Sequence, residues 1–70
     1  KPALSFFIEA LSDPDWTIRR AAARALGSIG PGARDALPAL SKLNEDCDEK
    51  EIVRNMAQWS IEEIRKYVKY

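Results

Sequence analysis

The chain has 70 residues, of which 46% are hydrophobic and 31% are charged, a composition that supports one folded domain with little margin of stability. Eleven basic and eleven acidic residues leave no net charge at neutral pH, so no long-range field draws the chain to nucleic acid or to an acidic membrane. The sequence has no histidine, the commonest metal ligand and general base, and its single cysteine, Cys47, excludes an intrachain disulfide.

The first predicted helix starts near Pro2, because proline suits a first helical turn. Apolar residues follow at the spacing i, i+3, i+4 and i+7, which places them on one helix face: Leu4, Phe7, Ile8 and Leu11. The segment 12–15 ends this helix and starts the next. Asp13 can cap the new helix, Pro14 fits its first position, and Asp15 lies near the positive end of its dipole.

The second predicted helix carries an apolar stripe that we expect to face the core: Ile18, Ala22, Ala25, Leu26 and Ile29. Gly30 follows the stripe directly, and Pro31 and Gly32 come next. This combination is a strong helix stop, so the helix is expected to end at Gly30.

The third segment repeats the first 32 residues later, with its apolar residues at the same spacing: Ala36, Ala39, Leu40 and Leu43. Pro38 falls inside this pattern, and proline lacks a donor and disfavours helix in the residues before it. We therefore predict a short turn over 33–36 and a helix that starts at about Leu37.

The fourth predicted helix repeats the second at an offset of 35 residues, so that Arg54 matches Arg19, Ala57 matches Ala22 and Ile61 matches Leu26. The change of offset from 32 to 35 predicts three inserted residues in the second interhelical loop, within 44–51. The buried side of this helix is expected to carry the following residues: Val53, Met56, Ala57, Ser60, Ile61, Ile64, Tyr67 and Val68.

A repeat of this length indicates stacked helical hairpins. The sequence therefore predicts an all-α fold: an α-solenoid of two helical hairpins, four helices in all, in a right-handed stack. The whole chain, 1–70, forms one domain, with repeat one over 3–30 and repeat two over 31–70.

The run from Leu11 to Gly30, with its acidic loop, its Ile18-Arg19 pair, its alanine-rich helix and its closing glycine, resembles HEAT repeats, in particular the short phycobilin-lyase type. The segment 36–40 continues the resemblance. It implies stacked hairpins whose second and fourth helices, the B helices, line a concave surface. The second repeat departs from the pattern at Met56, Trp59 and Glu62-Glu63 and has no closing glycine, as expected of a terminal repeat.

One group of candidate residues is structural. An arginine follows an acidic loop in each repeat, and arginine can fork across carbonyls and carboxylates of a neighbouring loop. The residues expected to tie the two repeats together are Asp13, Asp15, Arg19, Asp46, Asp48 and Arg54.

A second group is expected to bind a partner. At about 100° per residue, the helix side opposite the apolar stripe carries Trp16, Arg20, Ala23, Arg24 and Gly27 in the second helix, and Asn55, Gln58, Trp59, Glu62 and Lys66 in the fourth. Tryptophan and arginine often carry binding energy at interfaces. The candidate partner-binding residues are Trp16, Arg20, Arg24, Asn55, Trp59 and Lys66. The alternative for Trp59 is packing between the B helices, and for Trp16 it is covering of the loop.

No arrangement of residues indicates catalysis, a metal or a cofactor. The acids around Cys47 lack the glycine and the distal glutamate of a calcium loop, and they disfavour a reactive thiolate. Glu62 and Glu63 are adjacent on a helix and point in different directions, so they cannot work as an acid and base pair. The iron-dependent HEAT-like hydroxylases need histidine, which the chain lacks.

We therefore expect a cytoplasmic protein-binding scaffold or adaptor that is not an enzyme, has no membrane segment and is a terminal part of a longer repeat array. Two alternatives stay open: binding of a chromophore or its carrier protein, as in phycobilin lyases, and binding of a nucleic-acid backbone through Arg20, Arg24 and Lys66. Phe6 stands beside the Phe7 stripe, so self-association through a Phe6 face is a further expectation.

Overall fold

The computed structural model describes residues 3–66, and within this range the chain is helical without a strand. Its elements are, in order, α1 (Ala3–Ala10), α2 (Trp16–Ile29), the 3₁₀ segment η1 (Gly30–Ala36), α3 (Leu37–Glu45) and α4 (Glu51–Lys66). This confirms the predicted all-α repeat fold of two helical hairpins. Pro2, Tyr67 and Val68, which were assigned to the ends of predicted helices, lie outside the described residues.

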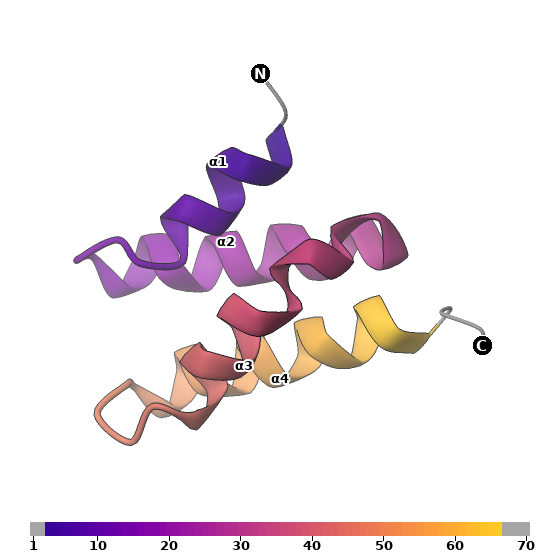
Figure 1. Ribbon diagram of the computed structural model, residues 1–70. Helices are drawn as coiled ribbons and strands as arrows, with labels where there is room; N and C mark the ends of the chain where they lie inside the picture. Colours follow the sequence, from indigo (N-terminus) through magenta and orange to yellow (C-terminus); the bar gives the residue numbers. More distant parts are fainter. Residues whose placement is uncertain (1–2, 67–70) are drawn as a thin grey trace.

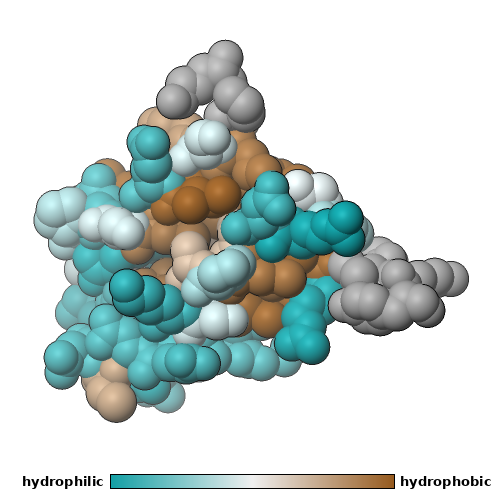
Figure 2. All heavy atoms as spheres, viewed as in Figure 1, coloured by the Kyte–Doolittle hydropathy of each residue, from teal (hydrophilic) through white to brown (hydrophobic). Residues whose placement is uncertain are grey.

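The helices form two layers. Figure 1 shows α1 and α3 in front of α2 and α4, with α2 and α4 side by side and running in the same direction. The principal extents of 33 × 27 × 16 Å fit a slab two helices thick. On the face shown in Figure 2, apolar residues gather towards α1 and the centre, whereas the side of the interhelical loops is hydrophilic.

The start of α2 differs from the prediction in its capping residue. Asp15, with extended backbone angles, is the N-cap, and its carboxylate accepts from the backbone N–H of Thr17 at 3.0 Å. Asp13 instead accepts from the N–H of Asp15 at 2.8 Å and so shapes the turn before the cap. The other end agrees with the prediction: Gly30 closes α2 at φ 78°, a backbone conformation that favours glycine.

The proline in the second hairpin lies where the sequence predicts. Pro38 occupies the first turn of α3, where its missing N–H needs no partner, and the preceding η1 segment forms the predicted turn. The three extra residues of the second repeat do not lengthen its loop. They extend α3 to Glu45, so that five residues separate the two helices in each hairpin.

A core of aliphatic residues lies between the two layers, with Leu26, Leu40, Val53 and Ile64 fully buried. The prediction of which residues of α2 face the core is partly wrong. Ile18 and Ile29 are 43% and 44% exposed, whereas Ala23 and Gly27, expected on the outward face, are buried. The reason is that α2 turns its small residues towards α4, and the Ile18–Ile29 stripe faces away from that neighbour.

Leu40 provides a direct test of this core. Truncation of Leu40 to alanine leaves a cavity among fully buried neighbours and should lower the free energy of unfolding by about 2–5 kcal/mol. Urea denaturation measures the loss. Phe6→Ala is the control, because Phe6 is 62% exposed and its truncation should change stability little. Equal stability of the Leu40 variant and the parent would place Leu40 outside the core.

Candidate protein-binding site

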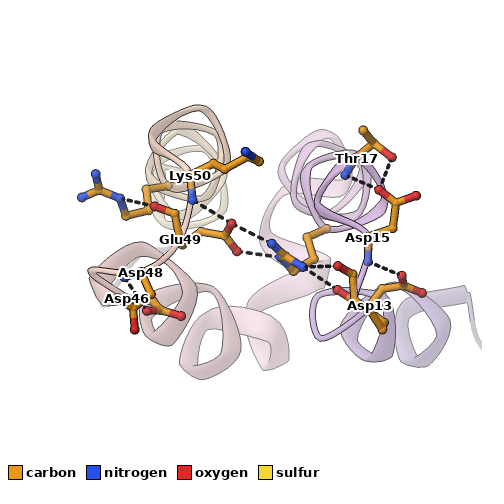
Figure 3. A network of polar contacts seen from close by, with 10 residues as sticks. Asp13, Asp15, Thr17, Asp46, Asp48, Glu49 and Lys50 are labelled. Atoms are coloured by element: carbon orange, nitrogen blue, oxygen red, sulfur yellow. Dashed lines mark hydrogen bonds and ion pairs between the residues drawn. The ribbon is translucent and has the colours of Figure 1, made fainter.

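The two hairpins are joined at their loop ends by one arginine fork. Arg19 at the start of α2 donates from Nε to Oε1 of Glu49 at 2.6 Å and from Nη2 to Oε2 at 2.8 Å. Its Nη1 donates to the carbonyl oxygens of Asp13 and Pro14, at 2.7 and 3.0 Å. Figure 3 shows Glu49 reaching from the second hairpin towards the first. Arg19 therefore ties its own loop and the neighbouring loop together.

Glu49 is held on both sides. Its side chain is 3% exposed, and Oε2 also accepts from the backbone N–H of Lys50 at 2.9 Å. The hydrogen-bonded guanidinium of Arg19 holds the pKa of Glu49 below its ordinary value, against the opposing effect of burial, and Glu49 in turn raises the pKa of Arg19. Both groups are therefore charged at neutral pH.

The aspartates assigned to the tie between repeats do not make it. The Asp15 carboxylate also accepts from the Thr17 hydroxyl at 2.7 Å, which lowers the pKa of Asp15, and Asp46 accepts from the N–H of Asp48 at 2.9 Å. Short aspartate side chains reach the backbone two residues on and stabilise their own loops. The bridging carboxylate is Glu49, whose longer side chain spans the gap.

Arg54, the counterpart of Arg19, bonds only within its own hairpin among the described residues. Its Nε donates to the carbonyl oxygen of Glu49 at 3.3 Å. This is the same contact with the preceding loop that Arg19 makes through Nη1. Arg19 also donates to a carboxylate of the other hairpin, and Arg54 makes no such bond within residues 3–66.

Trp16 lies at the joint between the hairpins. It is half-buried and packs against the core, and the Lys50 ammonium lies 5.5 Å from the centroid of its ring. A cation at this distance over an indole face is attracted by the ring. These contacts fit the alternative reading, in which Trp16 covers the loop region.

Trp59 combines packing with exposure. A Cβ atom on Gly27 would lie 2.5 Å from Cζ3 of Trp59 and 3.0 Å from Cα of Ser60, so α2 and α4 approach each other closely here. The indole thus lies against the bare backbone of Gly27, yet Trp59 remains 39% exposed. One side of the ring is fixed by α2 and the other side is accessible.

Ile52 is a candidate site residue that the sequence reasoning missed. It is 48% exposed, and it precedes Trp59 by seven residues, so both lie on one face of α4 with Met56 between them. A signal was present in the repeat, because the matching position in the first hairpin is the polar Thr17. An apolar residue in place of a polar one could therefore have been noticed in the sequence.

The remaining candidate residues lie on α2 and α4, and they differ in exposure and in the contacts they make. Arg20 is half-buried and Arg24 is exposed, and neither forms a hydrogen bond or ion pair within the described residues. Asn55 is exposed on α4. Lys66 lies one turn beyond Glu63, with 3.7 Å between Nζ and the carboxylate, and is thus engaged at the far end of α4.

A separate cleft of about 420 Å³ lies on the loop side. Its lining residues include Leu11, Pro14, Lys42 and Asp46, and the Arg19–Glu49 pair forms part of its wall. The carboxylates there serve the turns and the fork described above. This cleft is therefore a consequence of how the loops are held.

Comparison with known protein families gives a match over most of the chain. The sequence model of the family described as HEAT repeats matches residues 1–62. Neither a curated protein nor a solved structure matches the chain. Among the residues that the structure describes, none of the helices combines the length and the apolar character needed to cross a bilayer.

The Arg19–Glu49 fork predicts how stability depends on pH. Because the pKa of Glu49 is lowered in the folded state, its contribution is present at neutral pH and is lost as the pH falls through that lowered value. Glu49→Gln should therefore lose about 2 kcal/mol at pH 7, less than for a fully buried pair because Arg19 is partly exposed. The difference from the parent should shrink towards pH 2. Asp48→Asn, in the same loop, is the control, and urea melts at pH 7 and pH 2 provide the comparison. A constant difference at both pH values would contradict this role.

The close approach at Gly27 predicts a steric penalty. Gly27→Ala places a methyl group against the Trp59 ring and the Ser60 backbone, so overpacking should outweigh the gain in helix propensity and destabilise by about 1–2 kcal/mol. Gly32→Ala is the matched control, since its Cβ would meet only Cγ2 of Ile29 at an ordinary 3.4 Å. Thermal melts of both variants test this. An equally or more stable Gly27 variant would show that α2 and α4 are farther apart.

Proposed function

The chain belongs to the HEAT-repeat family, and we propose that it is a protein-interaction module that binds its partner along the outward faces of α2 and α4. Stacked helical repeats commonly serve as scaffolds that present an extended surface to other proteins. The fold alone does not select the surface or the partner. The choice rests on the side chains of α4 and α2.

The observation that carries the proposal is the exposed apolar strip on α4 formed by Ile52, Met56 and Trp59. Its two ends are 48% and 39% exposed, although an aromatic ring of this size is usually covered in a folded chain. The contact of Trp59 with Gly27 holds the indole in place before a partner arrives. A ring that is already ordered loses little entropy on binding, which favours its use as an anchor.

The neighbouring helix adds positive charge to this strip. Arg20 lies seven residues before Gly27 on the same face of α2, and Arg24 is exposed one turn further along. Since neither arginine has an acidic partner within the described residues, both can donate charge-assisted hydrogen bonds to a ligand. The strip therefore suits a protein segment that presents apolar side chains beside carboxylates.

The two alternatives from the sequence receive less support. Binding of a nucleic-acid backbone is disfavoured by the negative charges of Glu62 and Glu63 on α4, which would repel phosphates, and by the absence of net charge on the chain. For a chromophore, the chain matches HEAT repeats in general, and the finer resemblance to phycobilin lyases adds no specific observation. Protein binding without catalysis remains the function proposed for this strip.

Affinity capture with the purified chain as bait tests the proposal, followed by titration of the captured protein. Trp59→Ala should weaken the binding of that protein at least about tenfold, as expected for loss of a central aromatic anchor. Ile52→Ser should weaken it by a smaller factor. Phe6→Ser is the matched control, because Phe6 is an exposed apolar residue on α1 and should have no effect.

Thermal melts of each bait variant separate loss of binding from loss of folding. Full retention of the captured proteins by a folded Trp59→Ala bait would contradict the proposed site.

A further inference from the structure

Arg20 of α2 carries a positive charge that the described part of the chain leaves without a counter-ion. Its side chain is half-buried, and its Nε atom is covered and has no hydrogen-bond partner within residues 3–66. The two Nη atoms are accessible and make no bond to the described residues. Because the covered Nε holds the guanidinium in place, its Nη edge is oriented to bind an acceptor with two oxygens, such as a carboxylate.

Two further cations lie near Arg20. Arg24 follows one turn later on α2 and is exposed. Lys50, at the start of α4, lies over Trp16, which precedes Arg20 by one turn. None of the three cations forms an ion pair within the described residues. Lys50, Arg20 and Arg24 therefore form a basic line that begins at the loop end and follows α2, although the chain as a whole carries no net charge.

This basic line lies beside the apolar strip of α4. The Ser60 backbone comes against Gly27, and α2 and α4 run in the same direction (Figure 1). Arg20 precedes Gly27 by seven residues. Ile52 precedes Ser60 by eight, so Arg20 lies at nearly the same height as the start of the strip. Arg24, one turn further along, lies beside the middle of the strip.

The spacing of the two lines favours a helical ligand. Four residues separate the arginines and seven separate the ends of the strip, so a ligand needs carboxylates about 6 Å apart and apolar side chains spread over about 10 Å. A helix provides both, at i and i+4 on one face and at i and i+7 on the adjoining face. An extended segment would leave its backbone N–H and C=O groups unpaired, because the surface consists of helices whose own backbone groups are already bonded.

The far end of the strip is less suited to carboxylates. Glu63 lies one turn after Trp59 and is half-buried, and the Lys66 ammonium is 3.7 Å from its carboxylate. These two charges offset each other. The carboxylates of a ligand therefore gain most beside Arg20 and Arg24.

We propose that the partner segment is an acidic amphipathic helix that lies along the α2–α4 face. Two of its carboxylates, about one turn apart, bind Arg20 and Arg24. Apolar side chains on its adjoining face contact the strip of Ile52, Met56 and Trp59. This role depends on the proposed function, since the same strip is the site, and it adds the fold and the charge of the partner segment.

Selection from a random peptide library displayed on phage tests this partner, with the 70-residue chain as the immobilised target. We expect the enriched peptides to carry acidic residues three or four positions apart beside an apolar face. The tightest peptide is then synthesised with a label, and its Kd is measured by fluorescence polarisation. An absence of enriched peptides, or a basic or uncharged consensus, would overturn the proposal.

Arg20→Gln combined with Arg24→Gln should raise the Kd of this peptide at least about tenfold, because charge-assisted hydrogen bonds are lost. Arg34→Gln combined with Arg65→Gln is the matched control. It removes two exposed arginines outside the basic line, changes the net charge equally and should leave the Kd nearly unchanged. An equal loss in both double variants would indicate a general charge effect and overturn the proposal.

The peptide provides a second control on the same contacts. Exchange of its glutamates for glutamine should weaken binding to the parent chain but not to the variant that lacks Arg20 and Arg24, because both changes remove the same contacts. Thermal melts show whether each variant is folded, and Arg24→Gln alone, at an exposed position, gives a smaller rise in Kd if the double variant unfolds. A proline at the centre of the peptide should abolish binding, and unchanged binding would overturn the helical form.

Trp59→Ala separates this proposal from the proposed function. Peptides that need Trp59 but not the arginines would leave the strip as the binding site and overturn only the acidic partner. Peptides that bind the Trp59→Ala chain as tightly as the parent would contradict the strip itself, and with it both proposals. A labelled single-stranded RNA whose saturable binding requires Arg20 and Arg24 would assign these arginines to phosphate groups, and this too would overturn the proposal.

Discussion

The close approach of α2 and α4 at Gly27 is the contact on which the rest of the structure depends. Because Gly27 has no side chain, the Ser60 backbone and the Trp59 ring come directly against α2 in a close seam, and Ala23, buried one turn before Gly27, keeps this face of α2 narrow. Packing at this density tolerates little change in volume. The seam brings the two hairpins into one body, and it also leaves one side of the Trp59 indole open to solvent.

Apolar packing alone does not fix the position of one helix along another. Contacts at the loop ends fix this register. The Arg19–Glu49 fork is bidentate, and its geometry is met in only one register of the two hairpins. Lys50 over Trp16 adds a second link at the same end. The tight seam and the fork together make α4 a rigid support for the exposed strip that we propose as the binding site.

The sequence predicts the elements of this fold well, because local rules determine them. Gly30 ends α2 through its left-handed backbone, and Pro38 is compatible only with the start of a helix. The sequence predicts less well which residues meet across the repeats. Ile18 and Ile29 follow the periodicity of a core face, but periodicity alone cannot show that α2 turns its small residues, Ala23 and Gly27, towards α4 instead. Glu49 was missed as the partner of Arg19 because four aspartates nearby fit the same charge pattern. The sequence does not show that only the longer glutamate side chain reaches Arg19 across the two hairpins.

The ring current of Trp59 tests the central contact most directly. If the indole lies against Gly27, an NMR spectrum of the 70-residue chain should show a Gly27 Hα resonance shifted strongly upfield and cross-relaxation between that proton and the Trp59 ring protons. The shift should disappear in Trp59→Leu and persist in Trp16→Phe. A Gly27 Hα at an ordinary helical shift, without cross-relaxation to Trp59, would contradict the close seam and with it the rigid support for the binding strip.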